Sequence, residues 1–283
     1  MTLPLTQTLG LKPGLYIVAT PIGNLEDITV RALRILKSCD LIACEDSRIS
    51  RTLLSHYSIN KPLVVYHDHN ADHIRPRLLQ DIKDGKSIVL ISDAGTPLIS
   101  DPGYKLVKMC QENDVYYTVI PGACAVISGL VLSGMPSDRF FFAGFVESAK
   151  FPAHQRIDGT LIYYESSKRL VKTLQKMAQI FNNRHVTVVR EITKIFEEAV
   201  AGTFEEAISH FTDHPARGEI VITLSPPSQT ELSDDDINAL LTHHLKTESV
   251  KDASRIVAET LGISKKHTYQ LALLQLDLLR AKS

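Results

Sequence analysis

The sequence has little of three things, namely charge excess of one sign, cysteine and long apolar runs. Its 283 residues carry 31 Lys and Arg against 32 Asp and Glu, a formal net charge of −1. Nucleic-acid-binding domains usually carry a strong basic excess, so this balance argues against a protein that binds polyanions through overall charge alone. It does not exclude a local basic groove. No apolar run reaches membrane-spanning length, and the first twelve residues lack the basic-then-apolar pattern of a signal peptide. We therefore expect a soluble cytoplasmic protein with no membrane partner.

Several cofactor and metal signatures are also missing. The four cysteines form no CxxC pair, and no Cys/His spacing matches a zinc site, so we expect reduced thiols and no metal. The first strand is not followed by G-x-G-x-x-G, and no Walker lysine motif occurs, which argues against nicotinamide and P-loop chemistry. His67, His69 and His73 lie close together without a metal-ligand spacing, so we interpret them as loop or rim residues.

What the sequence does contain is an α/β pattern. Between residues 15 and 121, strand-like and helix-like segments alternate, which predicts a parallel sheet with helices on both faces. The expected strands are 15–20, 41–44, 63–66, 87–91 and 115–120, and the expected helices are 30–37, 50–56, 74–83, 105–113 and 125–133.

The second half has more turns and predicts a mixed sheet. Its expected strands are 140–145, 160–164, 185–190, 199–203 and 219–224, and its expected helices are 168–181 and 204–211. A break at Gly134 and a Pro-rich linker at 225–228 divide the chain into domains 1–134 and 135–228 and a helical tail, 229–283. The tail resembles a helix-turn-helix, with helices at 252–261 and 264–274 and the turn at Gly262. Ser264 is the expected cap of the second helix. The alternative is a hairpin for packing or dimerisation.

The loop 92–103 is the most informative segment. It follows a buried strand and holds two Gly, two Pro, two Asp, two Ser and a Thr in twelve residues. Three other loops, 19–24, 45–48 and 121–123, also follow parallel strands. Ligands bind in the crevice at the carboxyl ends of such strands, so the four loops predict one ligand site. The alternative is an elaborate strand-to-helix connection, with Asp93 and Asp101 only capping turns.

A family resemblance rests on these motifs together. Its carriers are 19–29, Glu45-Asp46-Ser47-Arg48, 92–103, 121–125, Phe142-Ala143-Gly144-Phe145, Glu165-Ser166-Ser167-Lys168-Arg169, Arg190-Glu191-Ile192-Thr193-Lys194 and Gly218-Glu219. The chain resembles the tetrapyrrole methylase superfamily, most closely the bacterial branch that methylates the ribose 2'-oxygen of a cytidine in 16S ribosomal RNA, in the decoding region of the small subunit. The resemblance implies two α/β domains, S-adenosylmethionine bound in the cleft between them, and a homodimer.

Positions in the cofactor site follow from the resemblance. It implies cofactor contacts from Pro21, Asp93, Ala94, Gly95, Thr96, Ile99, Cys124, Ala125, Tyr164 and Glu165. The small residues of loop 92–103 agree with this, because backbone amides can hold an amino-acid carboxylate without bulky side chains.

Methyl transfer to a ribose hydroxyl also needs alignment and a base that removes the proton. The candidate bases are Glu45, Asp46 and Lys194, the last only if its pKa is depressed. The candidate RNA contacts are Arg48, Lys168, Arg169, Lys265 and Lys266. Simpler interpretations remain for some of these residues. Glu45, Asp46 and Arg48 could form only a local ion pair, Arg169 could be a solvated residue in the first turn of a helix, and Thr193 and Lys194 could simply end a strand.

Two alternatives to the RNA methyltransferase remain open. One is methylation of a tetrapyrrole precursor on the same fold, and the other is a helix-turn-helix protein that senses S-adenosylmethionine. The chain also departs from its relatives at Ser167-Lys168, where they usually carry Pro-His, and in the short segment 150–158, where they carry a longer basic one. Both departures lie on the expected substrate side, so they put RNA contacts rather than cofactor binding in question.

Overall fold

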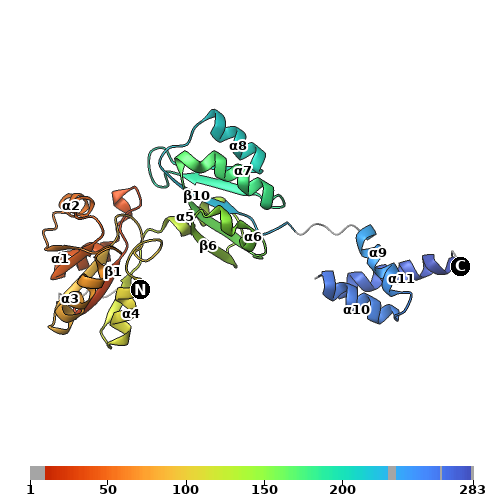
Figure 1. Ribbon diagram of the computed structural model, residues 1–283, viewed down its shortest axis with the longest axis horizontal. Helices are drawn as coiled ribbons and strands as arrows, with labels where there is room; N and C mark the ends of the chain where they lie inside the picture. Colours follow the sequence, from red (N-terminus) through yellow and green to blue (C-terminus); the bar gives the residue numbers. More distant parts are fainter. Residues whose placement is uncertain (1–9, 229–233, 262, 282–283) are drawn as a thin grey trace, which may run out of the picture. The chain divides into compact units, whose positions relative to one another are not determined.

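The computed structural model describes residues 10–228, 234–261 and 263–281. The chain divides into two compact units, one ending at Pro227 and the other beginning at Ser228. The first unit contains two β-sheets, and the second contains helices (Figure 1). The predicted boundary at residue 134 stays a prediction; it falls inside the first unit, between the two sheets.

The first sheet is entirely parallel, in the order β3-β2-β4-β1-β5. Its region contains β1 (Gly14–Val18), η1 (Leu25–Asp27), α1 (Val30–Ser38), β2 (Leu41–Cys44), α2 (Ser47–His56), β3 (Leu63–Val65), α3 (Ala71–Lys83), β4 (Ser87–Ile91), α4 (Tyr104–Glu112), β5 (Tyr117–Ile120) and α5 (Ala125–Ser133). On β1, Tyr16 and Val18 pack with α1 and α2. Leu15 and Ile17 pack with α3 and α4. Successive side chains of a strand point to opposite faces, so both faces of this sheet are buried.

The second sheet is mixed, in the order β6-β7-β10-β8-β9, and β6–β7 is its parallel pair. Its elements are β6 (Phe140–Phe145), η2 (Ser148–Lys150), α6 (Phe151–His154), β7 (Thr160–Ser166), η3 (Ser167–Arg169), α7 (Leu170–Ile180), β8 (Val186–Arg190), β9 (Glu198–Gly202), α8 (Phe204–Asp213) and β10 (Glu219–Leu224). Helices α7 and α8 cover one face, and α5 covers the other (Figure 1). The predicted α/β fold, with a parallel sheet followed by a mixed one, is confirmed.

Helix α5 joins the two sheets. Val126 and Leu130 of this helix share an apolar cluster with Ile22 from the first sheet's loops and with Val221 from β10. The helix comes so close to β10 that a Cβ on Gly129 would lie 2.6 Å from Cγ1 of Val221. Only glycine permits this approach, and the shared cluster fixes the loops of both sheets around one cleft.

Some boundaries differ from the sequence prediction for local reasons. Helix α2 begins at Ser47 rather than at 50, because the Asp46 side chain accepts a hydrogen bond from the Arg48 amide (2.8 Å) and caps it. The helix expected at 168–181 begins as the 3₁₀ turn Ser167–Arg169 and becomes α-helical only at Leu170. The short helix α6 was not predicted.

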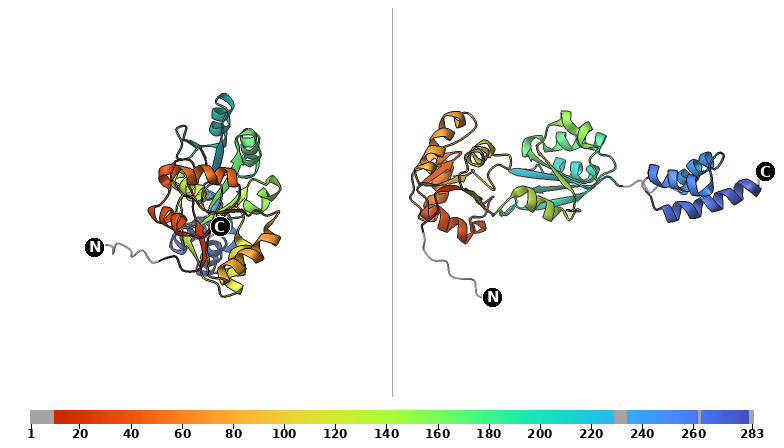
Figure 2. Two further views of the ribbon diagram at one scale, coloured as in Figure 1. Left: turned by 90° about the vertical axis from the view of Figure 1, so that its left-hand side faces the viewer. Right: turned by 90° about the horizontal axis from the view of Figure 1, so that it is seen from below.

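The second unit is formed by α9 (Asp234–His244), α10 (Val250–Leu261) and α11 (Lys265–Ala281). Figure 2 shows the three helices lying together. Their apolar core includes Ile237, Leu241 and Val257. The Ser264 hydroxyl accepts a hydrogen bond from the His267 amide (3.4 Å), the capping role that the sequence predicts. Gly262, the predicted turn residue, lies outside the described residues. Among the described helices, none combines the length and apolarity that crossing a membrane requires.

Candidate active site

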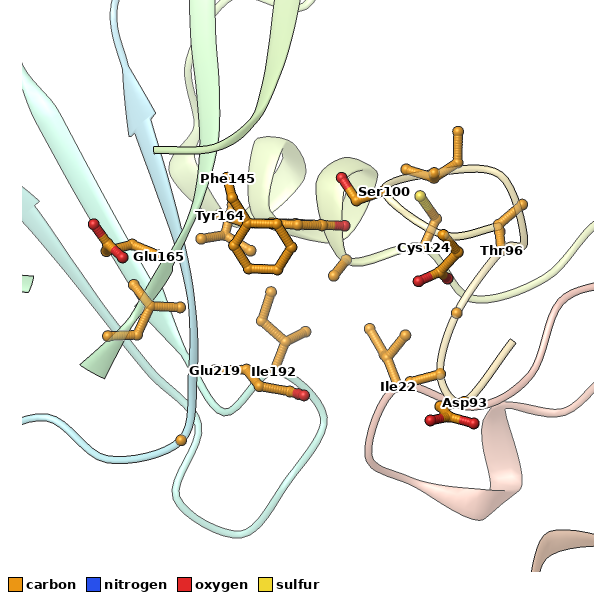
Figure 3. A pocket seen from close by; sticks show the side chains of 18 of the residues that line it. Ile22, Asp93, Thr96, Ser100, Cys124, Phe145, Tyr164, Glu165, Ile192 and Glu219 are labelled. Carbon is orange, nitrogen blue, oxygen red and sulfur yellow. The ribbon is translucent and has the colours of Figure 1, made fainter. Parts of the chain in front are cut away.

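A pocket of about 440 Å³ lies between the two sheets of the first unit. All four loops that follow β1, β2, β4 and β5 contribute to it, as the crevice prediction requires. Figure 3 shows Ile22, Asp93, Thr96 and Cys124 on one side and Phe145, Tyr164, Ile192 and Glu219 facing them. The lining residues are Ile22, Glu45, Asp93, Ala94, Gly95, Thr96, Ile99, Ser100, Asp101, Cys124, Ala125, Phe145, Tyr164, Glu165, Ser166, Ile192, Gly218, Glu219, Ile220 and Val221.

The loop after β4 forms one wall of the pocket. It is hydrogen-bonded to the loops that follow β1 and β5. Thr20 and Gly95 exchange two backbone hydrogen bonds, with N···O distances of 2.8 and 3.1 Å. The Thr96 hydroxyl donates to the Ala123 carbonyl (2.9 Å). Gly95 has φ +76°, a conformation that favours glycine. This loop is therefore a braced backbone surface that can approach a ligand closely.

Three carboxyl groups gather on this side of the pocket. Burial is the main cause that raises the pKa values of Glu45, Asp93 and Asp101 above their usual range. The negative charges of Asp101 and Asp93 raise the pKa of Glu45 further. The backbone amide of Asp46 donates to Oδ1 of Asp93 (3.0 Å) and holds that side chain in place. The group is a partly desolvated acidic wall that suits a cationic ligand centre.

Two aromatic rings from the second sheet form the opposite wall. Phe145 and Tyr164 meet edge to face, with ring centroids 5.5 Å apart. A register shift between Phe142 and Phe145, with Gly144 at φ +71°, interrupts the β6–β7 pairing at this point. Such bulges re-aim side chains next to functional sites, and here Phe145 lines the pocket (Figure 3).

Glu165 borders the pocket, but its carboxylate is engaged elsewhere. Oε1 accepts from the Ser166 amide (2.7 Å) and from Arg169, and Oε2 accepts from the Thr173 hydroxyl (2.6 Å). Figure 3 shows the carboxylate turned away from Cys124 and Thr96. Glu165 therefore organises the turn that carries Arg169.

Lys194 is held by two carboxylates. Its Nζ lies 2.9 Å from Oε1 of Glu191 and 3.3 Å from Oε2 of Glu219. Burial alone would lower the pKa of Lys194, but its hydrogen bonds and the charges of these carboxylates outweigh burial and raise that pKa above its usual range. The condition under which Lys194 could act as a base, a depressed pKa, is not met. The two ion pairs therefore weigh against Lys194 as a base, and the choice among the candidate bases stays a prediction.

Asp46 and Arg48 form a local ion pair, as the simpler interpretation of Glu45, Asp46 and Arg48 expected for these two residues. Arg48 donates Nε and Nη2 to the carboxylate, with a shortest distance of 2.6 Å. The hydrogen bonds from Arg48 lower the pKa of Asp46 to about 2, and Asp46 does not line the pocket. So acidic a group is a poor proton acceptor, and of the three bases that the sequence predicts, Glu45 is the one that lines the pocket.

The structure thus brings together most of the predicted cofactor residues. Those that line the pocket are Asp93, Ala94, Gly95, Thr96, Ile99, Cys124, Ala125, Tyr164 and Glu165. Pro21 is buried beside Ile22 and does not line it. Lys168 and Arg169 also lie outside the lining. In the second unit, Lys265 pairs with Glu259 (2.9 Å) and Lys266 is exposed.

Sequence reasoning missed several lining residues, among them Ile22, Phe145, Ile192 and Val221. Three of them were quoted within motifs without a site role. The signal for Phe145 was the glycine before it, because a glycine inside a strand marks a bulge or a close approach. Val221 carried no signal, since it belongs to a buried strand and reaches the pocket only through sheet packing.

The pocket fits the cofactor that the sequence predicts. Apolar and aromatic side chains can cover an adenosine, the backbone of 94–96 can bind an amino-acid end, and the acidic wall faces a cationic centre. Within residues 10–228, 234–261 and 263–281, no three His, Cys, Asp or Glu side chains are grouped as a metal site would need.

Comparison with known proteins points the same way. Residues 14–208 match the family of tetrapyrrole (corrin/porphyrin) methylases, and residues 231–277 match the RsmI C-terminal HTH domain. Ribosomal RNA small subunit methyltransferase I of Haemophilus influenzae is 42% identical, over 93% of this chain and 97% of its own length. The protein of the same name from Rickettsia prowazekii is 45% identical, over 78% of this chain and 81% of its own.

A solved structure shares the fold at low identity. Uroporphyrin-III C-methyltransferase from Thermus thermophilus, complexed with S-adenosyl homocysteine, aligns with a TM-score of 0.52 and 18% identity. The alignment covers 75% of this chain and 97% of that one. At this identity the likeness concerns the fold alone.

Proposed function

The chain belongs to the tetrapyrrole (corrin/porphyrin) methylase family, and on that premise we propose that it is an S-adenosylmethionine-dependent methyltransferase of small-subunit ribosomal RNA. The finer proposal is that it methylates the ribose 2'-oxygen of a cytidine in 16S rRNA. The observation that carries the activity is the pocket between the sheets, with its braced backbone wall, acidic wall and aromatic wall. The substrate class is inferred from the name of a relative that the chain matches along nearly its whole length.

The cofactor supplies a methyl group on a positively charged sulfur. The backbone of Ala94, Gly95 and Thr96 holds its amino-acid end, and Tyr164 and Phe145 cover its flat part. Glu45, Asp93 and Asp101 face the positive charge. These residues bind and orient, and alignment of the acceptor oxygen, methyl carbon and sulfur supplies much of the rate.

Glu45 is the proposed general base. As the acceptor oxygen bonds to the methyl carbon, the carbon–sulfur bond breaks, the hydroxyl proton passes to the Glu45 carboxylate, and the sulfur leaves as a neutral thioether. Burial and the neighbouring carboxylates raise the pKa of Glu45, which makes its carboxylate a stronger proton acceptor than an ordinary glutamate. Glu45 is preferred to Asp46 and Lys194 because those two residues lie outside the pocket lining and are held in ion pairs.

RNA is the proposed substrate, bound in the small ribosomal subunit. Arg48, Lys168 and Arg169 supply positive charge on the elements that flank the pocket, and Lys265 and Lys266 supply it in the tail. A tetrapyrrole substrate is the alternative on the same fold. RNA is favoured because tetrapyrrole enzymes resemble the chain only in fold, whereas the ribosomal RNA enzymes match at 39–45% identity. Such a substrate places the enzyme in the cytoplasm.

A homodimer is part of the proposal. β5 is an edge strand of the first sheet, and it exposes Tyr117 and Val119. Beside it runs an apolar groove whose lining includes Pro97, Leu98 and Val107. An unpaired edge with exposed apolar side chains is a surface that another chain can cover, and a second copy is the proposed occupant. Thr96 and Ile99 line both this groove and the pocket, so dimerisation would brace the cofactor loop.

The test of the function offers the protein three acceptors with a methyl-labelled cofactor: small subunits without the modification, free 16S rRNA and a tetrapyrrole precursor. Label should appear in RNA as a ribose 2'-O-methyl group, identified by resistance of the adjacent linkage to alkali and by mass spectrometry. Label in the tetrapyrrole, or in an RNA base, would contradict the proposal. An unlabelled cofactor with each acceptor controls for exchange.

A further inference from the structure

The loop between β8 and β9 carries two apolar side chains in full solvent. Ile195 is 94% exposed and Phe196 is 70% exposed, the two highest values among the large apolar residues of this loop. Exposed apolar side chains that cluster in this way mark interaction sites. We call these two residues the loop tip.

The loop tip is held in place by its own hydrogen bonds. The Lys194 amide donates to the Glu191 carbonyl, and the Glu197 amide donates to the Lys194 carbonyl, both at 3.0 Å. The Thr193 amide donates to the Glu197 carboxylate (2.6 Å). The backbone on both sides of the tip is thus fixed, so Ile195 and Phe196 are presented to solvent by an ordered loop.

The loop that carries the tip borders the pocket at its base. Ile192, at the base of the loop, lines the pocket. Across the cleft, the Asn24 amide donates to the Thr193 hydroxyl (3.0 Å). The loops from the two sheets approach so closely that a Cβ on Gly23 would lie 2.6 Å from Cγ of Lys194. The base of the loop that carries the tip therefore borders the pocket and contacts the loop after β1.

The charges near the pocket favour an uncharged contact at this place. Lys194 is bound by Glu191 and Glu219, Arg169 by Glu165, and Arg48 by Asp46. A phosphate must compete with these carboxylates, so these basic residues bind a phosphate more weakly than unpaired ones would. Single-stranded RNA is commonly bound by stacking its bases on exposed aromatic rings, which needs no net charge.

We propose that Phe196 stacks on an unpaired base of the ribosomal RNA substrate next to the nucleotide in the pocket, with Ile195 packing beside that base. The proposal rests on the proposed function, because it requires an RNA strand at the pocket. It makes Phe196 a substrate-positioning residue: it contributes to binding of the RNA and takes no part in the proton transfer.

The experiment measures initial rates of methylation of unmodified small ribosomal subunits by full-length variants, together with the Kd for S-adenosylhomocysteine. Phe196→Ala should raise KM for the subunits about tenfold, the effect of losing one stacked base, and leave kcat within about twofold. Phe196→Tyr, which keeps the ring, should restore KM. Tyr104→Ala removes an aromatic ring that is 63% exposed and lies outside the pocket lining, and it should change neither constant.

The outcomes separate the proposal from its premise. If the wild type does not methylate the subunits, the proposed function fails, whatever Phe196 does. If the wild type is active and Phe196→Ala keeps its KM, the stacking proposal is wrong. It is also wrong if Phe196→Ala changes the sedimentation of the free protein, because the tip is then a contact between chains. An unchanged Kd for S-adenosylhomocysteine shows that the variant is folded.

Discussion

Arg169 donates to Oε1 of Glu165 from Nη2 at 2.7 Å, and this carboxylate is buried beside the pocket. The Ser166 amide and the Thr173 hydroxyl complete its hydrogen bonds. The turn between β7 and α7 is therefore built around one buried negative charge, and the guanidinium that neutralises it is also a candidate RNA contact.

Arg169→Met should lower the free energy of unfolding by about 1–3 kcal/mol, because it takes a charged hydrogen-bond partner from a buried carboxylate. Urea denaturation measures this change. The matched control is Arg139→Met, whose ion pair with Asp158 is exposed on both sides and should change stability by less than about 1 kcal/mol. Equal effects of the two substitutions would show that the Glu165 pair has no special weight.

Glu45→Gln should lower the single-turnover rate of methylation about 10²–10⁴-fold without changing the Kd for the cofactor, since the amide cannot accept the proton. Asp46→Asn should retain far more activity, because Asp46 lies outside the pocket. Equal losses in both variants, or full activity of Glu45→Gln, would remove Glu45 from the role of base.

The pH dependence of the rate tests the environment of the same group. Only the ionised Glu45 accepts a proton, so the rate should fall as pH drops through its raised pKa. The charge of Asp101 contributes to that raised pKa. Asp101→Asn should therefore move the acid limb of the profile of single-turnover rate against pH to lower pH. A shift to higher pH would contradict the assignment.

Gly95→Ala should weaken cofactor binding on the order of tenfold. Gly95 has a positive φ, and a Cβ there would lie 3.2 Å from Cγ2 of Ile22 in the pocket wall. Gly85→Ala is the matched control, because Gly85 also has a positive φ but open space around its Cβ. Both variants should lose about 1–3 kcal/mol of stability from backbone strain, but only Gly95→Ala should change the Kd measured by calorimetry.

Cys124 should be the one fast-reacting thiol of the four, and bound S-adenosylhomocysteine should protect it. Burial raises the pKa values of Cys39 and Cys110 to about 11 and also raises that of Cys44, so little of their reactive thiolate exists at pH 8. Cys124 is half-buried and lines the pocket. Timed alkylation followed by peptide mass spectrometry measures each site. Equal labelling of Cys124 with and without ligand would place the cofactor elsewhere.

Val119→Asp on the edge strand β5 should convert the proposed homodimer to monomer, because it puts an unpaired charge on the apolar surface. Sedimentation velocity measures the change. Val30→Asp is the control: Val30 is also exposed, but it lies on α1. A wild-type protein that sediments as a monomer would refute the dimer directly.

The sequence by itself determined the fold class and the position of the ligand loops. Continuous apolar strands alternating with amphipathic helices specify a parallel sheet buried on both faces, and the residue types of 92–103 identify a loop that approaches a ligand. These are local patterns, each contained in a short segment.

The tertiary structure decided which polar residues are available for chemistry. Asp46, Lys194 and Glu165 are each held by a partner close in sequence, namely Arg48, Glu191 and Arg169. Lys194 has a second partner, Glu219, which lies 25 residues away and comes near only through the pairing of β8 with β10. Glu45 stands out because the fold partly buries it and brings the charges of Asp93 and Asp101, nearly fifty residues or more away along the chain, close to it. Burial and charge depend on neighbours in space, and the sequence does not contain those distances.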